Sequence, residues 1–116
     1  MEDKPLEAKE RKDVPVYRGC FDYFPEALCA VAYLSLVGNE QHNPGKELHW
    51  DRSKSGDELD ALGRHLLKCG EADTDSIWHD VKVAWRGLAN LQKQIEKHGY
   101  RQVTGTDREA EDISEQ

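Results

Sequence analysis

Apolar residues gather in three stretches of this chain, and their spacing in each stretch predicts an α-helix. The first stretch, residues 25–37, opens with Pro25, which suits a first helical turn because the N–H that proline lacks has no partner there. The apolar residues of this stretch cover every side of the helix, so we expect it to be buried all round. Two other short helices can hardly surround it, and we therefore expect a partner subunit to cover the rest.

The second and third stretches carry the start and stop signals of two further helices. Ser55 and Glu58 have the spacing of a capping box, and Gly70 is suited to ending the helix that they start. The third helix is expected to run from about residue 75 to the stop signal at Gly99. These patterns predict an all-α fold, a small helical bundle of three main helices that oligomerisation completes.

The chain has 116 residues and a formal net charge of −7, and this charge is unevenly distributed. Residues 1–17 and 101–116 carry net charges of −1 and −3 with little to bury, so both are predicted to be mobile tails. Residues 18–100 hold all five histidines and all three tryptophans and are predicted to be the folded, nucleotide-binding domain. Its net charge of −3 argues against long nucleic acids, but not against a small nucleotide that carries its own metal ions.

Composition also bears on location. No apolar run approaches the roughly 20 residues that cross a bilayer, and the charged residues 1–12 are unlike a signal peptide. Three cysteines without paired spacing fit reduced thiols better than a disulfide framework. We therefore expect a cytoplasmic protein that does not bind membranes.

Polar residues gather in the loop expected at residues 38–54 and in the turn expected at residues 70–75. A loop this long in a small domain is uncommon unless it binds something. The turn supplies three carboxylates just before the third helix, and clustered carboxylates suit a hard cation such as Mg²⁺. The alternative is that Asp73 or Asp75 caps that helix.

Positive residues follow the third predicted helix about one turn apart, beside two tryptophans. His79, Lys82 and Arg86 lie on one side of it by helical-wheel geometry, while Trp78 and Trp85 flank its apolar stripe. The line of positive groups would bind a polyphosphate, and the neighbouring indole rings would stack on a base. The alternative is a solvated basic face whose aliphatic stems cover the Trp rings.

Several short motifs occur in an order that resembles a known family. They are Pro25-Glu26-Ala27-Leu28, Gly38-Asn-Glu-Gln-His-Asn43, Leu48-His-Trp-Asp51, Arg64-His-Leu66, Asp73-Thr-Asp75, His79 and Lys82-Val-Ala-Trp-Arg86. Together, over residues 20–95, they resemble the phage family of dATP/dGTP diphosphohydrolases, in its N-terminal domain. That family looks like a branch of the MazG-like, all-α nucleoside triphosphate pyrophosphohydrolases.

The resemblance implies a helical bundle of two or more subunits that acts on nucleotides with Mg²⁺ or Mn²⁺. The implied reaction is attack of water on the α-phosphorus of a dNTP of the dGTP or dATP class, which releases dNMP and pyrophosphate. This reaction needs a metal ion that holds the phosphates, positive groups and an oriented water molecule, rather than an activated side-chain nucleophile. If it is encoded by a phage, the enzyme would act in the host cytoplasm.

The resemblance also implies roles for individual residues. The two histidines among the catalytic set would orient or deprotonate the attacking water, or hydrogen-bond a phosphate. The expected catalytic residues are Glu40, His65 and His79. The expected metal ligands are Glu26, Glu40, Asp73 and Asp75. The expected nucleotide-binding residues are His42, Asn43, His49, Trp50, Lys54, Arg64, Lys82, Trp85 and Arg86.

Two other functions stay open. The MazG-like enzymes carry Glu-Glu-x-x-Glu and Glu-x-x-Asp helical motifs, and Asp57-Glu58-Leu-Asp60 is the nearest approach in this chain. A phage protein with a cation-lined pocket but few catalytic carboxylates would instead bind without cleaving, as a sponge for nucleotide immune signals such as cyclic oligonucleotides or ADP-ribose derivatives. The third possibility is a zinc or HNH-like nuclease site at His42, Asn43 and His49, which lacks paired cysteines and a surrounding strand pattern.

Overall fold

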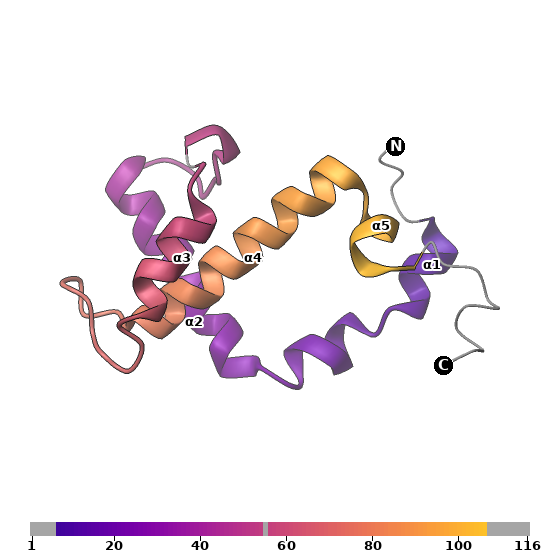
Figure 1. Ribbon diagram of the computed structural model, residues 1–116, viewed down its shortest axis with the longest axis horizontal. Coiled ribbons are helices and arrows are strands. Elements are labelled where there is room, and N and C mark those ends of the chain that lie inside the picture. The colour runs from indigo at the N-terminus through magenta and orange to yellow at the C-terminus, as the bar shows by residue number, and fades with distance from the viewer. Residues whose placement is uncertain (1–6, 55, 107–116) are drawn as a thin grey trace. The chain divides into compact units, whose positions relative to one another are not determined.

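Helices dominate the computed structural model, which describes residues 7–54 and 56–106 (Figure 1). The α-helices are α1 (Ala8–Asp13), α2 (Pro25–His42), α3 (Glu58–Leu66), α4 (His79–His98) and α5 (Tyr100–Thr104). A π-helical turn at Tyr17–Phe21 and a 3₁₀ turn at Arg52–Lys54 complete the regular structure, and within the described residues the only β pairing is an isolated bridge between Ala72 and Trp78. The predicted all-α class with three main helices is confirmed, while oligomerisation stays a prediction.

The chain divides into two compact units. One unit comprises Pro15–Asn90 and therefore contains α2, α3 and the first part of α4. The other combines Met1–Val14 with Leu91–Gln116, and its described part contains α1 and α5. Helix α1 thus lies within the first predicted tail, and α5 lies at the start of the second. The mobility of these tails stays a prediction.

Helix α2 begins at Pro25 as expected but ends at His42, five residues beyond the predicted end. The extra turn is held by the buried side chain of Asn39, whose Nδ2 donates to the carbonyl oxygen of Lys46 at 3.0 Å. The Oδ1 atom of Asn39 accepts the N–H of His49 at 3.3 Å, so the following loop folds back onto the helix end. Glu40, placed in a loop by the sequence pattern, is therefore helical.

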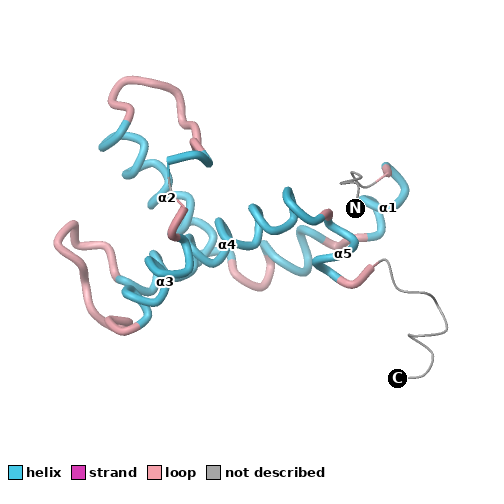
Figure 2. The backbone as a smooth tube through the Cα atoms, turned by 45° about the horizontal axis from the view of Figure 1, so that its top comes forward, coloured by secondary structure: helices cyan, strands magenta, loops and turns pink. Residues whose placement is uncertain are grey.

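The starts of the other two main helices also differ from the predicted ones. Helix α3 begins at Glu58 with Asp57 as its N-cap, and Ser55, the predicted cap, lies outside the described residues. Helix α4 begins at His79 because the residues before it close a turn: the N–H of Asp73 donates to the carbonyl oxygen of Ile77 at 2.9 Å. Figure 2 shows this loop and the longer one between α2 and α3.

Small residues form the tightly buried apolar part of the Pro15–Asn90 unit. Ala61 in α3 and Ala89 in α4 are the buried hydrophobic residues within the described chain, where no large side chain is completely buried. A Cβ atom added at Gly87 of α4 would lie 3.7 Å from Leu62 Cδ1, so α3 and α4 pack at short range. Tyr33 on α2 is 58% exposed, and the partner subunit expected to cover this helix stays a prediction.

No α-helix within residues 7–54 and 56–106 combines the length and the apolar character that crossing a membrane requires.

An ion pair joins α1 to α5 in the unit that contains both. Two side-chain hydrogen bonds connect Arg101 to Glu10; in one of them, Nη2 of Arg101 donates to Oε1 of Glu10 at 2.6 Å. The N–H of Glu7 also donates to Oε1 of Glu10, at 3.0 Å. The Arg101 guanidinium, aided by this N–H, lowers the pKa of Glu10 to about 2.

Replacing Arg101 by Gln is expected to raise the pKa of Glu10 by more than about one unit, toward the ordinary value near 4.3. Because the folded pKa lies below the unfolded one, the stability that this carboxylate adds is complete above about pH 4.3 and is lost as pH falls toward 2. Titration of the Glu10 carboxyl by NMR measures the shift. Lys12→Gln, a charge change at an exposed position of α1, is the control, and an equal Glu10 pKa in R101Q and wild type would contradict the assignment.

Candidate functional site

A cavity of about 690 Å³ lies within the Pro15–Asn90 unit, among the end of α2, the loop after it, α3 and α4. Most residues predicted to bind a nucleotide line this cavity, although they lie up to 44 positions apart in the sequence. These residues are His42, Asn43, His49, Trp50, Lys54, Lys82, Trp85 and Arg86. The exception, Arg64, is exposed, does not line the cavity and pairs with Asp57 at 3.1 Å.

Two tryptophans form an aromatic wall of the cavity. The rings of Trp50 and Trp85 meet edge to face, with centroids 5.7 Å apart and planes at 75°. Trp85 is held in place by its Nε1–H, which donates to Ser35 Oγ in α2 at 2.8 Å. The guanidinium of Arg52 lies 4.2 Å from the centroid of the Trp50 ring, and that of Arg86 lies 5.5 Å from the centroid of the Trp85 ring, so both indoles are already in cation–π contacts.

An ion pair between a buried carboxylate and a half-buried guanidinium connects α3 to α4 at the cavity. Arg86 Nη1 donates to Oε1 of Glu58 at 3.1 Å, and the Glu58 side chain is only 5% exposed. Glu58 was not among the predicted site residues, although its position at the edge of the apolar arc of its helix is a signal of partial burial. The carboxylate of Glu58 positions the guanidinium of Arg86, which lines the cavity.

Lys82 binds two carboxylates of the turn before α4. Its Nζ donates to Oδ2 of Asp73 and to Oδ2 of Asp75, each at 2.8 Å. Burial opposes the charge of Lys82, but these two hydrogen bonds outweigh it and raise the pKa of the amine. The bond from Lys82 is also the main cause that lowers the pKa of Asp73 and of Asp75.

Neither turn carboxylate caps α4, so that alternative from the sequence is wrong. Asp73 Oδ1 accepts the N–H of Thr74 at 2.7 Å, and Asp75 Oδ1 accepts the N–H of Ile77 at 3.0 Å. All these groups precede His79, the first residue of the helix. The two carboxylates therefore stabilise the turn and neutralise Lys82.

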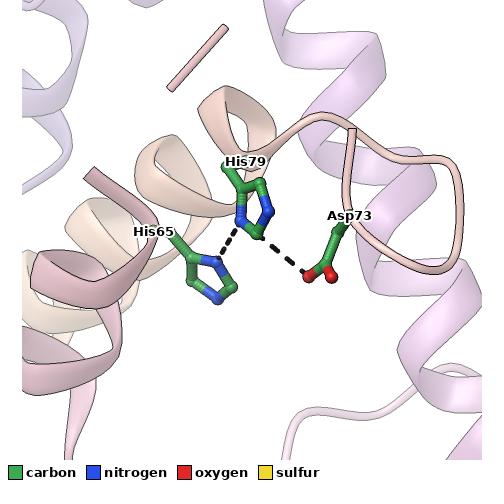
Figure 3. Close-up of side chains that lie close together, drawn as sticks. All are labelled: His65, Asp73 and His79. Atoms are coloured by element: carbon green, nitrogen blue, oxygen red, sulfur yellow. Dashed lines mark hydrogen bonds and ion pairs between the residues drawn. The ribbon is translucent and has the colours of Figure 1, made fainter. Parts of the chain in front are cut away.

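Two histidines and one aspartate converge, as Figure 3 shows, and the aspartate is one of the two that bind Lys82. The Nδ1 atoms of His65 in α3 and His79 in α4 lie 2.8 Å apart, and His79 Nδ1 lies 3.9 Å from Oδ2 of Asp73. Burial and the neighbouring His79 and Lys82 lower the pKa of His65, so its imidazole is neutral at pH 7. One ligand atom from each of the three residues lies within 4.8 Å of the others, close enough to hold a metal ion together.

The predicted metal ligands are not brought together as a set. Glu26 and Glu40 are exposed residues of α2 and do not line the cavity. They lie fourteen positions apart on one helix, about 21 Å along its axis, so the two cannot bind the same ion within one chain. Asp75 lines the cavity, whereas Asp73 belongs to the histidine cluster.

Comparison with known protein families, curated proteins and solved structures finds no match to this chain. The resemblance to the phage dATP/dGTP diphosphohydrolases therefore stays a prediction.

Replacing Arg86 by Met is expected to lower the free energy of unfolding by roughly 2–4 kcal/mol, because it leaves the buried carboxylate of Glu58 without this partner. Arg64→Met is the matched control: it breaks an ion pair whose two side chains are 66% and 53% exposed, so its effect should be under about 1 kcal/mol. Urea unfolding of the three proteins measures both changes. Equal losses of unfolding free energy in the two variants would show that burial of the Glu58–Arg86 pair does not contribute to stability.

Proposed function

We propose that the Pro15–Asn90 unit binds a nucleoside triphosphate together with Mg²⁺ or Mn²⁺ and hydrolyses it to the monophosphate and pyrophosphate. The observation that supports this proposal is that eight residues expected to contact a nucleotide line one cavity. Its volume of about 690 Å³ is in the usual range for small-molecule sites, about 300–1,000 Å³. The preference for dGTP or dATP rests on the family resemblance alone.

The two ends of a nucleotide find different chemistry in the cavity. Trp50 and Trp85 offer aromatic surface to the base. Lys54 and Arg86 offer positive charge to the phosphates, where cations stabilise the charge that develops as phosphorus reacts. Lys82 also lines the cavity, but its charge is already balanced by Asp73 and Asp75. This division supports a phosphorylated, aromatic ligand over a purely apolar one.

The proposed reaction is attack of a water oxygen on the α-phosphorus, with loss of pyrophosphate as the bond from that phosphorus to the bridging oxygen breaks. His65 lines the cavity and would position the water or a phosphate by a hydrogen bond. Arg86, held by Glu58, would neutralise the departing pyrophosphate. A divalent ion, when bound, would supply charge neutralisation and activation of the water.

A second function, binding without cleavage, is favoured by the state of the carboxylates. Asp73 and Asp75 are both bonded to Lys82 and to backbone N–H groups, and Glu40 is exposed on α2. In a cavity with positive side chains, carboxylates that are already hydrogen-bonded favour binding over cleavage. The protein would then sequester a nucleotide signal in an anti-defence role. A homo-oligomer and a cytoplasmic location stay predictions from the sequence under either function.

Incubation with a panel of dNTPs and Mn²⁺ or Mg²⁺, followed by chromatography, is expected to yield monophosphate and pyrophosphate. His65→Ala should lower the rate at least about 100-fold, because it removes the imidazole that positions the reacting groups. His98→Ala, on α4 but not lining the cavity, is the matched control and should retain the wild-type rate.

Two results would reject hydrolysis. Triphosphates that remain intact with both metals would exclude the proposed reaction for the panel. Intact nucleotide released by heat from a stable complex would establish sequestration in its place.

A further inference from the structure

We propose that His65, His79 and Asp73 form a binding site for one divalent transition-metal ion. The three side chains come from three successive pieces of chain, α3, the turn after it and the first residue of α4. Their ligand atoms already converge, with one atom from each residue within 4.8 Å of the others (Figure 3). The site differs from the predicted one, which combined four carboxylates and no histidine.

The donor atoms select the class of metal. Two of the three are imidazole nitrogens, which suit Fe²⁺, Ni²⁺, Cu²⁺ or Zn²⁺, and the third is a carboxylate oxygen, which also suits Mn²⁺. Mg²⁺ prefers oxygen ligands and retains much of its water. A site with one carboxylate and two imidazoles therefore favours Mn²⁺ over Mg²⁺, the two ions that the sequence left as alternatives. Three ligands from the protein would leave positions open for water or for phosphate oxygens.

The separations of the ligand atoms are compatible with a shared ion. With metal–ligand bonds of about 2.1 Å, two ligand atoms of one ion stand at most about 4.2 Å apart. The Nδ1 atoms of His65 and His79 are 2.8 Å apart, and His79 Nδ1 is 3.9 Å from Oδ2 of Asp73, so both pairs fall within that span.

Lys82 does not exclude a metal ion from this cluster. The Nζ of Lys82 donates one hydrogen bond to Oδ2 of Asp73, and Oδ1 of Asp73 accepts the N–H of Thr74. An ionised carboxylate has about four lone-pair sites, so Asp73 has acceptor capacity left for an ion beside His79. These two hydrogen bonds also hold the carboxylate in place near the imidazoles.

Metal binding would decide the role of His65. The 2.8 Å contact between two Nδ1 atoms needs a hydrogen on one of them, and a metal ion would require both atoms to be deprotonated. The remaining proton of each neutral ring then sits on Nε2. His65 would thus donate a hydrogen bond from Nε2 rather than act as a base. This role rests on the proposed function, whereas the metal site itself does not.

The full chain is titrated with Mn²⁺ in the absence of nucleotide, and binding is measured as the loss of the EPR signal of the free ion. We expect one ion bound per chain. Asp73→Asn keeps the shape of the side chain but removes its charge, and it should weaken binding at least tenfold. His65→Ala should do the same. His98→Ala, an imidazole of α4 outside the cluster, should bind Mn²⁺ like the wild type, and circular dichroism checks that each variant is folded.

Three results would each overturn the proposal. They are no Mn²⁺ uptake by the folded chain, displacement of Mn²⁺ by equal Mg²⁺, and unchanged affinity in D73N. Since no nucleotide is present, these results are independent of whether the protein hydrolyses dNTPs.

Discussion

The attachment of Lys82 to Asp73 and Asp75 is the interaction on which the site depends. The Lys82 side chain is only 14% exposed, and burying an ammonium group is costly unless carboxylates offset the lost hydration. Two carboxylates at 2.8 Å provide that compensation. In doing so they hold the turn that leads into α4 and place His79, the first residue of the helix, next to His65.

Polar contacts of the same kind hold the rest of the Pro15–Asn90 unit around its cavity. Glu58 and Arg86 join α3 to α4, while the indole N–H of Trp85 bonds to Ser35 of α2. Asn39 fastens the loop that carries several cavity residues. Since the buried apolar residues among those described are alanines, these polar contacts add to the close packing of α3 and α4 in holding the helices together.

The cavity and the histidine cluster share His65, which lines the cavity and bonds to His79. Lys82 also connects them, because it lines the cavity and binds Asp73 of the cluster. A phosphate in the cavity and an ion in the cluster would therefore be close enough to act together, as phosphoryl transfer requires. The overlap links the proposed hydrolysis to the proposed metal site, although each can be tested separately.

The sequence by itself determined the helical class, the start of α2 at Pro25 and the stop of α4 before Gly99, because these follow from local periodicity and backbone preferences. It also indicated most cavity residues, since polar and aromatic groups gathered in one loop and on one helix. Only the tertiary structure decided that His65 meets His79, that Glu58 is buried against Arg86, and that Glu26 and Glu40 stand apart on one long helix. Those outcomes depend on contacts between residues 14 to 28 positions apart and on the extra turn held by Asn39, which no local pattern encodes.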